Sequence, residues 1–412
     1  MSELRPFRSN DPDWLEDPYP HYREYREREP VHWGASAAPA LDGQWWFFRH
    51  EDVSALLADP RVGRDWRRMR EIMGAKPIPE SAAPLAEMLD RWMIQREGAE
   101  HARLRRITGR AFRPRTVARL RPRVEEAAAE RLSRIPDGEP FDLVARYARP
   151  FSVRIMSELL GVPREDQRRV GGWIRGLGKA FGGDSARAEA SDAGQAAFEL
   201  AAYLSGLLDE RLREPREDLL SDLVAEGVEG RFDRAEAVAT CMLLIGAGYS
   251  TVVHFLANAT HALLRAPEVL STLQAEPVRF EASVDELIRF DGPTQTGVRY
   301  TTEPISMGGE MIEAGSLIGL VIGSANRDPA AFDEPDRIDL DRDARHHLGF
   351  GRGPHYCLGS ALARLEGGIG LRALFERFPG LALGEEPPRW GDLVGRGIGR
   401  LQVAPGRNQQ LT

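Results

Sequence analysis

Lysine and cysteine are the residue types that this 412-residue sequence most lacks. Only two of its 55 basic residues, Lys76 and Lys179, are lysines. We attribute this bias to a high-GC bacterial genome, because no structural demand excludes lysine so completely. The two cysteines, Cys241 and Cys357, are too few for a disulfide framework or a cysteine-based zinc site, and they fit a reducing cytoplasm.

The sequence also lacks an excess of basic over acidic residues, and we expect no secretion signal. Its net charge of -8 argues against a nucleic-acid partner, and we expect a small-molecule partner instead. Its N-terminus is polar and proline-rich, without the apolar core of a signal peptide. Residues 237–264 carry no charged side chain, but polar residues such as His254 and Asn258 interrupt them. We therefore predict a buried core helix there, no membrane partner and a cytoplasmic location.

The apolar pattern predicts a mainly α-helical chain with a minor antiparallel β region. Alternating and β-branched residues favour strands near 31–33 and 44–48 and within 294–322. Three- and four-residue apolar spacing predicts helices over 21–27, 99–112, 116–133, 142–160, 192–213, 279–290 and 358–378. Asp233 and Glu236 fit a capping box at the start of the long uncharged helix, which should end before Pro267. No repeat or linker divides residues 1–412, so we expect a single domain.

The string FGRGPHYCLG, residues 350–359, is the most informative motif of the chain. It places Cys357 on a glycine-bent loop before an alanine-rich helix, where backbone N–H groups should favour a thiolate and lower the thiol pKa. A lone cysteine beside a glycine turn is most often structural. Here, however, six fixed residues would recur by chance with a probability on the order of 10⁻⁶.

This motif resembles the haem-binding signature of the cytochrome P450 family at every fixed position. The resemblance implies a haem b whose iron is ligated by the Cys357 thiolate, in a cytochrome P450 fold with the long central helix over the haem. It also implies that residues beside the ligand contact the haem, namely Phe350, Gly351, Leu358 and Gly359. The resemblance runs from about residue 21 to the C-terminus and indicates a single haem-thiolate domain.

Further segments resemble the parts of the family that hold the haem in place. Glu286 and Arg289 share a helical face, and with Arg342 they resemble a structural network of the family. A buried propionate needs cationic partners. The resemblance supplies four of them: His101, Arg105, Arg299 and His355.

The long uncharged helix contains a segment that resembles the oxygen-activating element of the family. The small residues Ala247 and Gly248 would leave space for dioxygen and weaken one helical turn, and the Thr251 hydroxyl would hold an ordered water. Ser250 stands where relatives usually carry an acid. A serine can pass a proton but cannot store one near neutral pH, so two interpretations stay open: Ser250 relays protons, or it bonds a carbonyl of its own helix.

The family alignment implies a substrate pocket and a face for a redox partner. The pocket would be formed by residues 66–93, 173–186, 245–252, 293–298 and 393–398, and its apolar members indicate a hydrophobic substrate. These members include Met88, Met93, Leu243, Ala247, Val298 and Ile398. Five arginines would steer an acidic ferredoxin, although each could equally be a solvated surface residue: Arg103, Arg106, Arg110, Arg113 and Arg352.

The resemblance as a whole implies a bacterial monooxygenase of secondary metabolism. It would insert an oxygen atom from dioxygen into a hydrophobic small molecule, with electrons from a ferredoxin and a ferredoxin reductase. Two alternatives stay open. One is oxidative C–C or C–O coupling or desaturation on the same scaffold, suggested by Ser250 and the neighbouring Tyr249; the other is a non-catalytic haem sensor or carrier.

Overall fold

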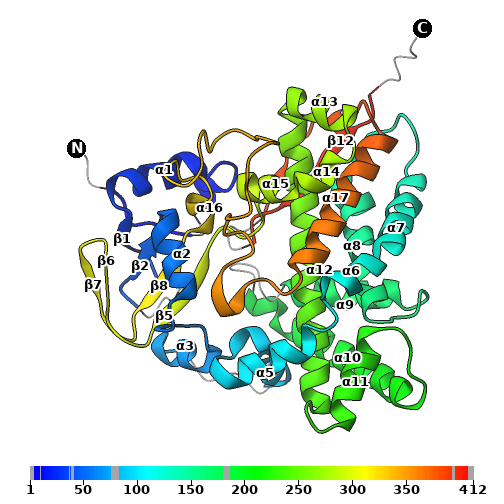
Figure 1. Cartoon of the computed structure of the whole chain (residues 1–412), viewed down its shortest axis with the longest axis horizontal. Helices are drawn as coiled ribbons and strands as arrows, with labels where there is room; N and C mark the ends of the chain where they lie inside the picture. The colour runs from blue at the N-terminus through cyan, green and yellow to red at the C-terminus, as the bar shows by residue number, and fades with distance from the viewer. Residues whose placement is uncertain are drawn as a thin grey trace.

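The computed structural model describes residues 4–9, 11–36, 38, 41–75, 83–179, 186–391 and 395–406. Most of these residues are helical, and in Figure 1 the helices fill the right-hand side while most strands lie on the left. The helices of the N-terminal half are α1 (Tyr19–Arg28), α2 (His50–Ala58), α3 (Trp66–Ile72), α4 (Ala83–Asp90), α5 (Gly98–Thr108), α6 (Pro114–Arg119), α7 (Arg121–Ser133), α8 (Arg149–Leu159), α9 (Gln167–Lys179) and α10 (Ala186–Arg213). Those that follow are α11 (Leu219–Val228), α12 (Arg234–Leu264), α13 (Pro267–Ala275), α14 (Arg279–Ala282), α15 (Val284–Asp291), α16 (Ile322–Ala325) and α17 (Ser360–Arg377).

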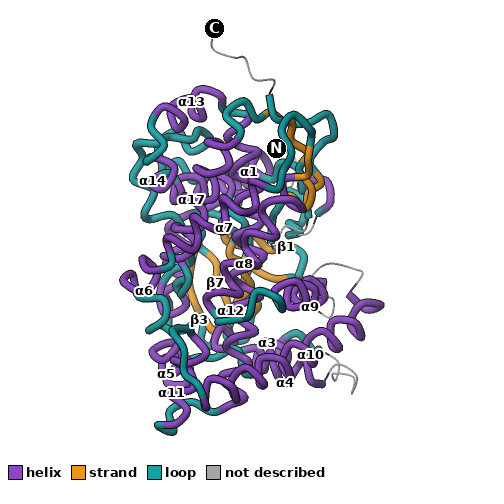
Figure 2. The backbone as a smooth tube through the Cα atoms, turned by 90° about the vertical axis from the view of Figure 1, so that its right-hand side faces the viewer, coloured by secondary structure: helices purple, strands orange, loops and turns teal. Residues whose placement is uncertain are grey.

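The strands form one larger sheet and three small ones. The five-stranded sheet has the order β1 (Val31–Gly34), β2 (Gln44–Phe47), β8 (Leu317–Leu320), β5 (Gly297–Thr301) and β3 (Val62–Gly63). The small sheets pair β6 (Ile305–Met307) with β7 (Glu310–Ile312), β10 (Arg389–Trp390) with β11 (Ile398–Arg400), and β12 (Gln402–Ala404) with β4 (Phe141–Asp142) and β9 (Ala382–Leu383). In Figure 2 the strands form a narrow band among the helices.

Helix α12 is the central element of the helical part. It is long and apolar enough to cross a membrane, but half of its most apolar window is buried inside the protein. Its neighbours include α8, α10, α15 and α17. The Asp233 carboxylate accepts the Glu236 N–H at 2.7 Å, and the Glu236 carboxylate accepts the Asp233 N–H at 3.0 Å, which completes the predicted capping box. The buried core helix expected from the sequence is therefore present.

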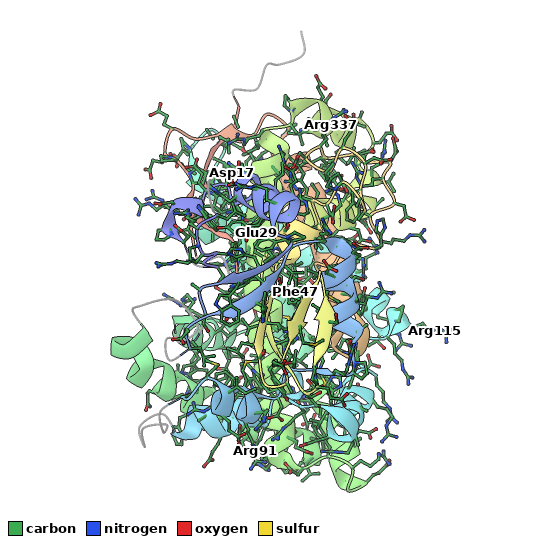
Figure 3. The ribbon with its side chains drawn as sticks, turned by 90° about the vertical axis from the view of Figure 1, so that its left-hand side faces the viewer. Asp17, Glu29, Phe47, Arg91, Arg115 and Arg337 are labelled. Carbon is green, nitrogen blue, oxygen red and sulfur yellow. The ribbon has the colours of Figure 1, made fainter. Side chains whose placement is uncertain are left out.

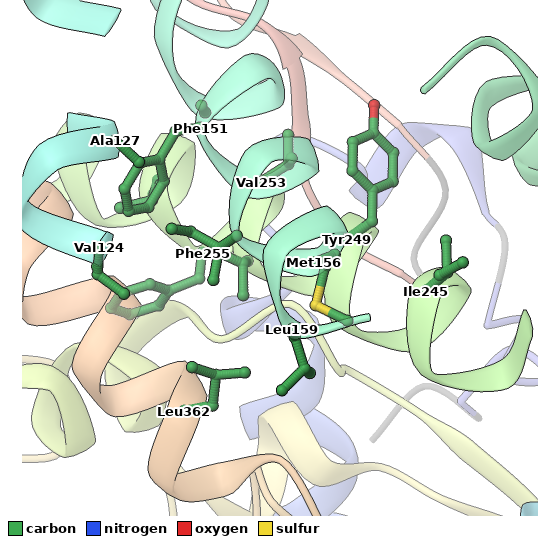
Figure 4. Packing of buried hydrophobic residues seen from close by; sticks show 14 of the residues in the cluster. Val124, Ala127, Phe151, Met156, Leu159, Ile245, Tyr249, Val253, Phe255 and Leu362 are labelled. Carbon is green, nitrogen blue, oxygen red and sulfur yellow. The ribbon is translucent and has the colours of Figure 1, made fainter. Parts of the chain in front are cut away.

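The hydrophobic core consists of apolar side chains buried around α12 and on the five-stranded sheet. A large cluster of apolar residues surrounds α12, and Figure 4 shows part of it, with Phe255 of α12 near Leu362 of α17. A second cluster packs on the sheet around Phe47, which is fully buried. In Figure 3 Phe47 lies within the ribbon, while charged side chains such as Arg91 and Arg115 point outward.

The mainly helical fold is confirmed, but several predicted segments differ from the structure. The helix expected over 116–133 is divided into α6 and α7, because Pro122 has no N–H to continue the α6 ladder and instead lies in the first turn of α7. The segment 142–160 begins with β4 and a π-helical turn, Val144–Ala148, before α8. The helix expected over 99–112 ends at Thr108, and that expected over 279–290 is interrupted at Ser283.

The β region is not wholly antiparallel. Strand β2 runs parallel to β8, with Trp45 opposite Ile318 and Phe47 opposite Leu320. Strands so far apart in the sequence need no hairpin, so their direction is free of the turn constraint that makes neighbouring strands antiparallel. Among the strand pairs of the described residues, this is the parallel one.

A buried ion network fixes the segment that leads to the Cys357 loop. The Glu286 carboxylate accepts from Arg289 Nε at 2.7 Å and from Arg342 Nε at 3.3 Å. Arg289 also donates to the carbonyl oxygens of Asn326, at 2.9 Å, and Pro335, at 2.8 Å. The network predicted from the sequence is therefore formed, and it ties α15 to the chain between α16 and residue 350.

Breaking this network should cost much more than breaking an exposed pair of the same spacing. Glu286→Gln leaves Arg289, which is 1% exposed, without its counter-charge, and we expect a loss of about 3–5 kcal/mol in the free energy of unfolding. Glu334→Gln breaks the exposed Glu334–Arg337 pair and should cost at most about 1 kcal/mol. Denaturant titration measures both values. Similar losses in the two variants would contradict the assignment.

Candidate active site

Cys357 lies on a tight loop between a 3₁₀ turn, Gly353–His355, and α17. Its N–H donates to the Phe350 carbonyl oxygen at 2.8 Å, which closes the loop. Gly351 and Gly353 have φ values of 70° and 71°, a region that disfavours other residues. A Cβ atom on Gly353 would also lie 2.8 Å from the Leu57 carbonyl oxygen, so α2 packs directly on the loop.

The expected fall in the pKa of Cys357 is wrong for the loop alone. Burial raises the pKa of the Cys357 thiol, and this outweighs the hydrogen bond from the Gly359 N–H and the charges of Arg105 and Arg364. A buried thiol of this kind becomes a thiolate when a cation replaces its proton. The loop is therefore suited to a metal ligand rather than to a free thiolate.

One cavity collects all of the predicted site residues except Ser250. It extends from the Cys357 loop to α12, with α5 and the segment before β5 at its sides. The predicted residues on its wall are His101, Arg105, Ala247, Gly248, Thr251, Arg299, Phe350, Gly351, His355, Cys357, Leu358 and Gly359. Residues from four separate segments of the sequence thus meet at one place.

A group of cationic side chains forms one end of the cavity. Arg64, Arg105 and Arg299 line it, together with His101 and His355, whose rings lie 4.2 Å apart. Burial lowers the pKa of Arg64 well below its usual range, that of Arg299 to about 10 and that of His101 to about 4. Each shift shows that the charged form lacks sufficient compensation in this pocket.

The charge of this group matches a ligand with two carboxylates. Glu97 accepts from the Arg64 N–H at 2.7 Å and contacts His355 Nε2 at 3.3 Å. The Glu97 charge acts on Arg64 and Arg299, whereas Arg105 lies by Cys357. Among the residues described, three arginines and one ionised carboxylate thus leave an excess of two positive charges at this end of the cavity. The haem implied by the resemblance carries two propionates on an apolar ring, so the cationic end, the apolar walls and the thiol all fit it.

Arg64 is a site residue that the sequence did not predict. It follows β3, which pairs with β5 so that Gly63 faces Tyr300, and this pairing places Arg64 beside Arg299. Strand β3 has two residues, too few for a pattern in the sequence. Arg105, the third arginine of the cavity, donates through Nη2 to the Tyr356 carbonyl oxygen at 2.6 Å. This bond also holds the Cys357 loop in place.

The hydroxyl groups of α12 bond carbonyl oxygens of their own helix. Thr251 Oγ1 donates to the Ala247 carbonyl oxygen at 2.6 Å, and Ser250 Oγ donates to the Gly246 carbonyl oxygen at 3.2 Å. Thr251 lines the cavity, whereas Ser250 is not part of the described wall. This arrangement supports the interpretation that Ser250 bonds a carbonyl of its own helix. The weakened helical turn expected at Ala247 and Gly248 is not seen, because α12 is continuous there.

Glu366 of α17 is a second site residue that the sequence did not predict. It lines the cavity but is only 1% exposed, and burial raises its pKa well above the usual range. Its Oε2 atom finds no hydrogen-bond partner within the described part of the chain. Burial therefore favours the protonated, neutral form of Glu366. In the sequence Glu366 belongs to the segment that resembles the family's helix after the ligand, but this resemblance gave it no role at the cavity.

The apolar pocket predicted from the sequence is correct only in part. Met93, Leu243 and Ala247 line the cavity. Met88 and Ile398 instead belong to the hydrophobic core, and Val298 packs beside Tyr300 because alternate residues of β5 point to opposite faces. Residues 76–82, 180–185 and 393–394, which fall in the predicted pocket segments, lie outside the described residues.

The five arginines expected at a partner surface fall into two groups. Arg103 forms an ion pair with Glu236, Arg110 pairs with Glu226, and Arg352 donates to Ser54. Arg106 and Arg113 are exposed. The two ion pairs, of Arg103 and Arg110, reduce the positive charge that this side of the protein offers.

Comparisons with known proteins agree with this geometry. The family model described as Cytochrome P450 matches residues 189–389. The cytochrome P450 monooxygenase PikC of Streptomyces venezuelae is 36% identical over 93% of this chain and 88% of its own. The vitamin D(3) 25-hydroxylase of Pseudonocardia autotrophica is 37% identical over 95% of this chain and 94% of its own. The crystal structure of CalO2, 31% identical, superposes with a TM-score of 0.89 over 98% of this chain and 100% of its own.

Removing Arg64 should weaken the retention of haem. Loss of a charge-assisted hydrogen bond costs about 1.5–3 kcal/mol, so Arg64→Ala should release haem roughly 10- to 100-fold faster to an excess of apomyoglobin. Arg67→Ala is the matched control, because Arg67 is exposed and paired with Asp90. If the two variants release haem at the same rate, Arg64 does not hold a propionate.

Proposed function

Because the chain belongs to the cytochrome P450 family and is a P450 monooxygenase, we propose that it oxidises a hydrophobic secondary metabolite at a haem b held by Cys357. The reaction inserts one oxygen atom of dioxygen into a C–H or C=C bond. One observation carries this proposal: the thiol of Cys357, the cationic end and the Thr251 hydroxyl line the same cavity. When bound, the haem supplies the iron at which dioxygen is activated and the oxygen atom is transferred.

The residues around the haem have separate tasks in this proposal. Cys357 ligates the iron. Arg64, Arg105 and Arg299 neutralise the propionates, with His101 and His355 as further hydrogen-bond donors. Phe350, Leu358 and the neighbouring glycines of the loop give the haem an apolar surface and limit the access of water to the sulfur.

Two groups on the cavity wall would hold and pass protons, the Thr251 hydroxyl of α12 and the Glu366 carboxyl of α17. Thr251 presents its hydroxyl oxygen to the cavity while its proton bonds the Ala247 carbonyl oxygen, so it accepts a hydrogen bond from a water and orients it. Ser250 bonds its own helix and stores no proton. The neutral carboxyl of Glu366 holds one, and we assign it as the proton source that Ser250 does not provide.

The walls of the cavity favour a hydrophobic substrate. Met93, Leu243, Val252 and Pro293 line it, and thioether side chains adapt to irregular shapes. One relative is named for polyketide biosynthesis, the cytochrome P450 PksS of Bacillus subtilis, 31% identical over 92% of this chain and 93% of its own. This name favours a substrate of polyketide type.

Electrons come from a separate ferredoxin and its reductase in the cytoplasm. The exposed Arg106 and Arg113, with the exposed Tyr356 next to the ligand, form the proposed docking face for an acidic partner. Arg103 and Arg110 contribute less than the sequence suggested, because Glu236 and Glu226 already compensate part of their charge. Arg352 keeps its charge but is held by the Ser54 hydroxyl.

Oxidative coupling or desaturation is the second candidate reaction. It is favoured by Ser250 in place of an acid, and by a structural neighbour whose title names C–S bond formation in chuangxinmycin biosynthesis, 28% identical with a TM-score of 0.85. Turnover under ¹⁸O₂ separates the two reactions. Insertion places one labelled atom in each product molecule, whereas products without label would establish coupling or desaturation instead.

Replacing Glu366 by glutamine should slow oxygen activation without damaging the fold. Glu366→Gln keeps the shape and the neutral charge but removes the transferable proton, and we expect at least a tenfold fall in kcat with haem content unchanged. Glu376→Gln, exposed on the same helix, is the control. An unchanged kcat and an unchanged solvent isotope effect in Glu366→Gln would remove this residue from the proton path.

A further inference from the structure

Helix α8 contacts α12 directly behind the hydroxyl groups of the cavity. We define residues 246–251 as the oxygen turn. The buried Ser152 of α8 donates through Oγ to the Tyr249 carbonyl oxygen at 3.2 Å. Four residues later on the same helix, the Met156 side chain packs on Gly248: a Cβ atom at Gly248 would lie 2.6 Å from Met156 Sδ and 3.0 Å from Met156 Cε.

Side-chain hydroxyls bond three carbonyl oxygens of the oxygen turn. Ser250 bonds the Gly246 oxygen and Thr251 bonds the Ala247 oxygen, both within α12, while Ser152 bonds the Tyr249 oxygen from a different helix. Hydroxyls that bond helical carbonyls weaken the backbone ladder and allow the helix to bend. The two internal bonds therefore make this turn easier to bend, although α12 is continuous there, and the bond from α8 fixes where its backbone lies.

The packing of Met156 acts in the same place. Met156 and Gly248 both line the cavity, and Gly248 carries no side chain that would separate the two helices. In Figure 4 the Met156 side chain lies between α8 and α12, and the Tyr249 ring points away from it. Helix α8 thus holds two successive residues, Gly248 and Tyr249, directly before the Ser250–Thr251 pair.

We propose that Ser152 and Met156 are positioning residues that hold the oxygen turn at its distance from the haem and so limit the loss of reduced oxygen. This inference rests on the proposed function of Thr251. Without the support, the turn and the waters it orders would shift. Dioxygen that has taken one electron from the reduced haem would then leave as superoxide, and two superoxide ions with two protons give one hydrogen peroxide and one dioxygen.

The test uses the haem-loaded full chain and needs no substrate or redox partner. Ser152→Ala removes the hydroxyl, and Met156→Ala removes the packing while keeping the Ser152 bond. The control is Ser157→Ala on the same helix, because Ser157 is 2% exposed and its hydroxyl has no hydrogen-bond partner within the described residues. Two quantities are measured: hydrogen exchange of the amides of residues 249–254, and the rate at which dithionite-reduced, desalted protein returns to the ferric form in air.

We expect both Ser152→Ala and Met156→Ala to raise the exchange and to speed reoxidation at least threefold, with Ser157→Ala unchanged in both. Unchanged exchange and reoxidation in Ser152→Ala would overturn the inference. Equal effects in Ser157→Ala would overturn it too, because α8 would then be loosened in general. If Ser152→Ala fails to load haem, Met156→Ala decides by the same two readouts.

Thr251→Ala distinguishes this inference from the proposed function. If Thr251→Ala speeds reoxidation and Ser152→Ala does not, the inference on α8 alone is overturned. If Thr251→Ala leaves reoxidation unchanged, the proposed role of Thr251 fails, and the inference that depends on it fails with it.

Discussion

An uncompensated excess of positive charge beside a half-buried thiol is the constraint on which the site depends. Arg64, Arg105 and Arg299 line a cavity whose other walls are mostly apolar, and the Glu97 charge acts on two of them, Arg64 and Arg299. Guanidinium groups are kept in such surroundings only when anions join them. Cys357, whose burial raises its thiol pKa, likewise needs a cation to become a ligand. A flat apolar macrocycle with two carboxylates and a central metal meets both needs at once.

The sequence predicted the parts of this site that lie in contiguous motifs. The Cys357 loop and the Thr251 segment are recognisable from short motifs that resemble the family. The Glu286–Arg289–Arg342 network was predicted from the same resemblance rather than from its spacing, and the structure forms all three. Arg64 and Glu366 were missed because only tertiary contacts bring them to the cavity: β3 pairs with β5, and one face of α17 turns inward. The single domain of residues 1–412 stays a prediction.

The α12 side of the cavity shows why the identity of Ser250 alone did not decide whether it relays protons. At Ser250 two roles were open from the sequence, and the geometry directs its hydroxyl to the Gly246 carbonyl oxygen, away from the cavity. Burial raises the pKa of Glu366, which also lines the cavity, and we propose its carboxyl as the proton source. Ser152 and Met156, on α8, act on the same turn from behind. The oxygen site is thus assembled from three helices, and the relatives named as hydroxylases weigh against a mere haem carrier.

The central claim is that Cys357 ligates the haem iron through its thiolate. The most direct measurement is the difference spectrum of the reduced protein with and without carbon monoxide, taken on wild type and on Cys357→Ala at equal haem content. If Cys357 is the ligand, we expect the red-shifted Soret band of a thiolate-ligated haem in the wild type and its loss in Cys357→Ala. A wild-type spectrum without that shift, or a variant that retains it, would contradict the account.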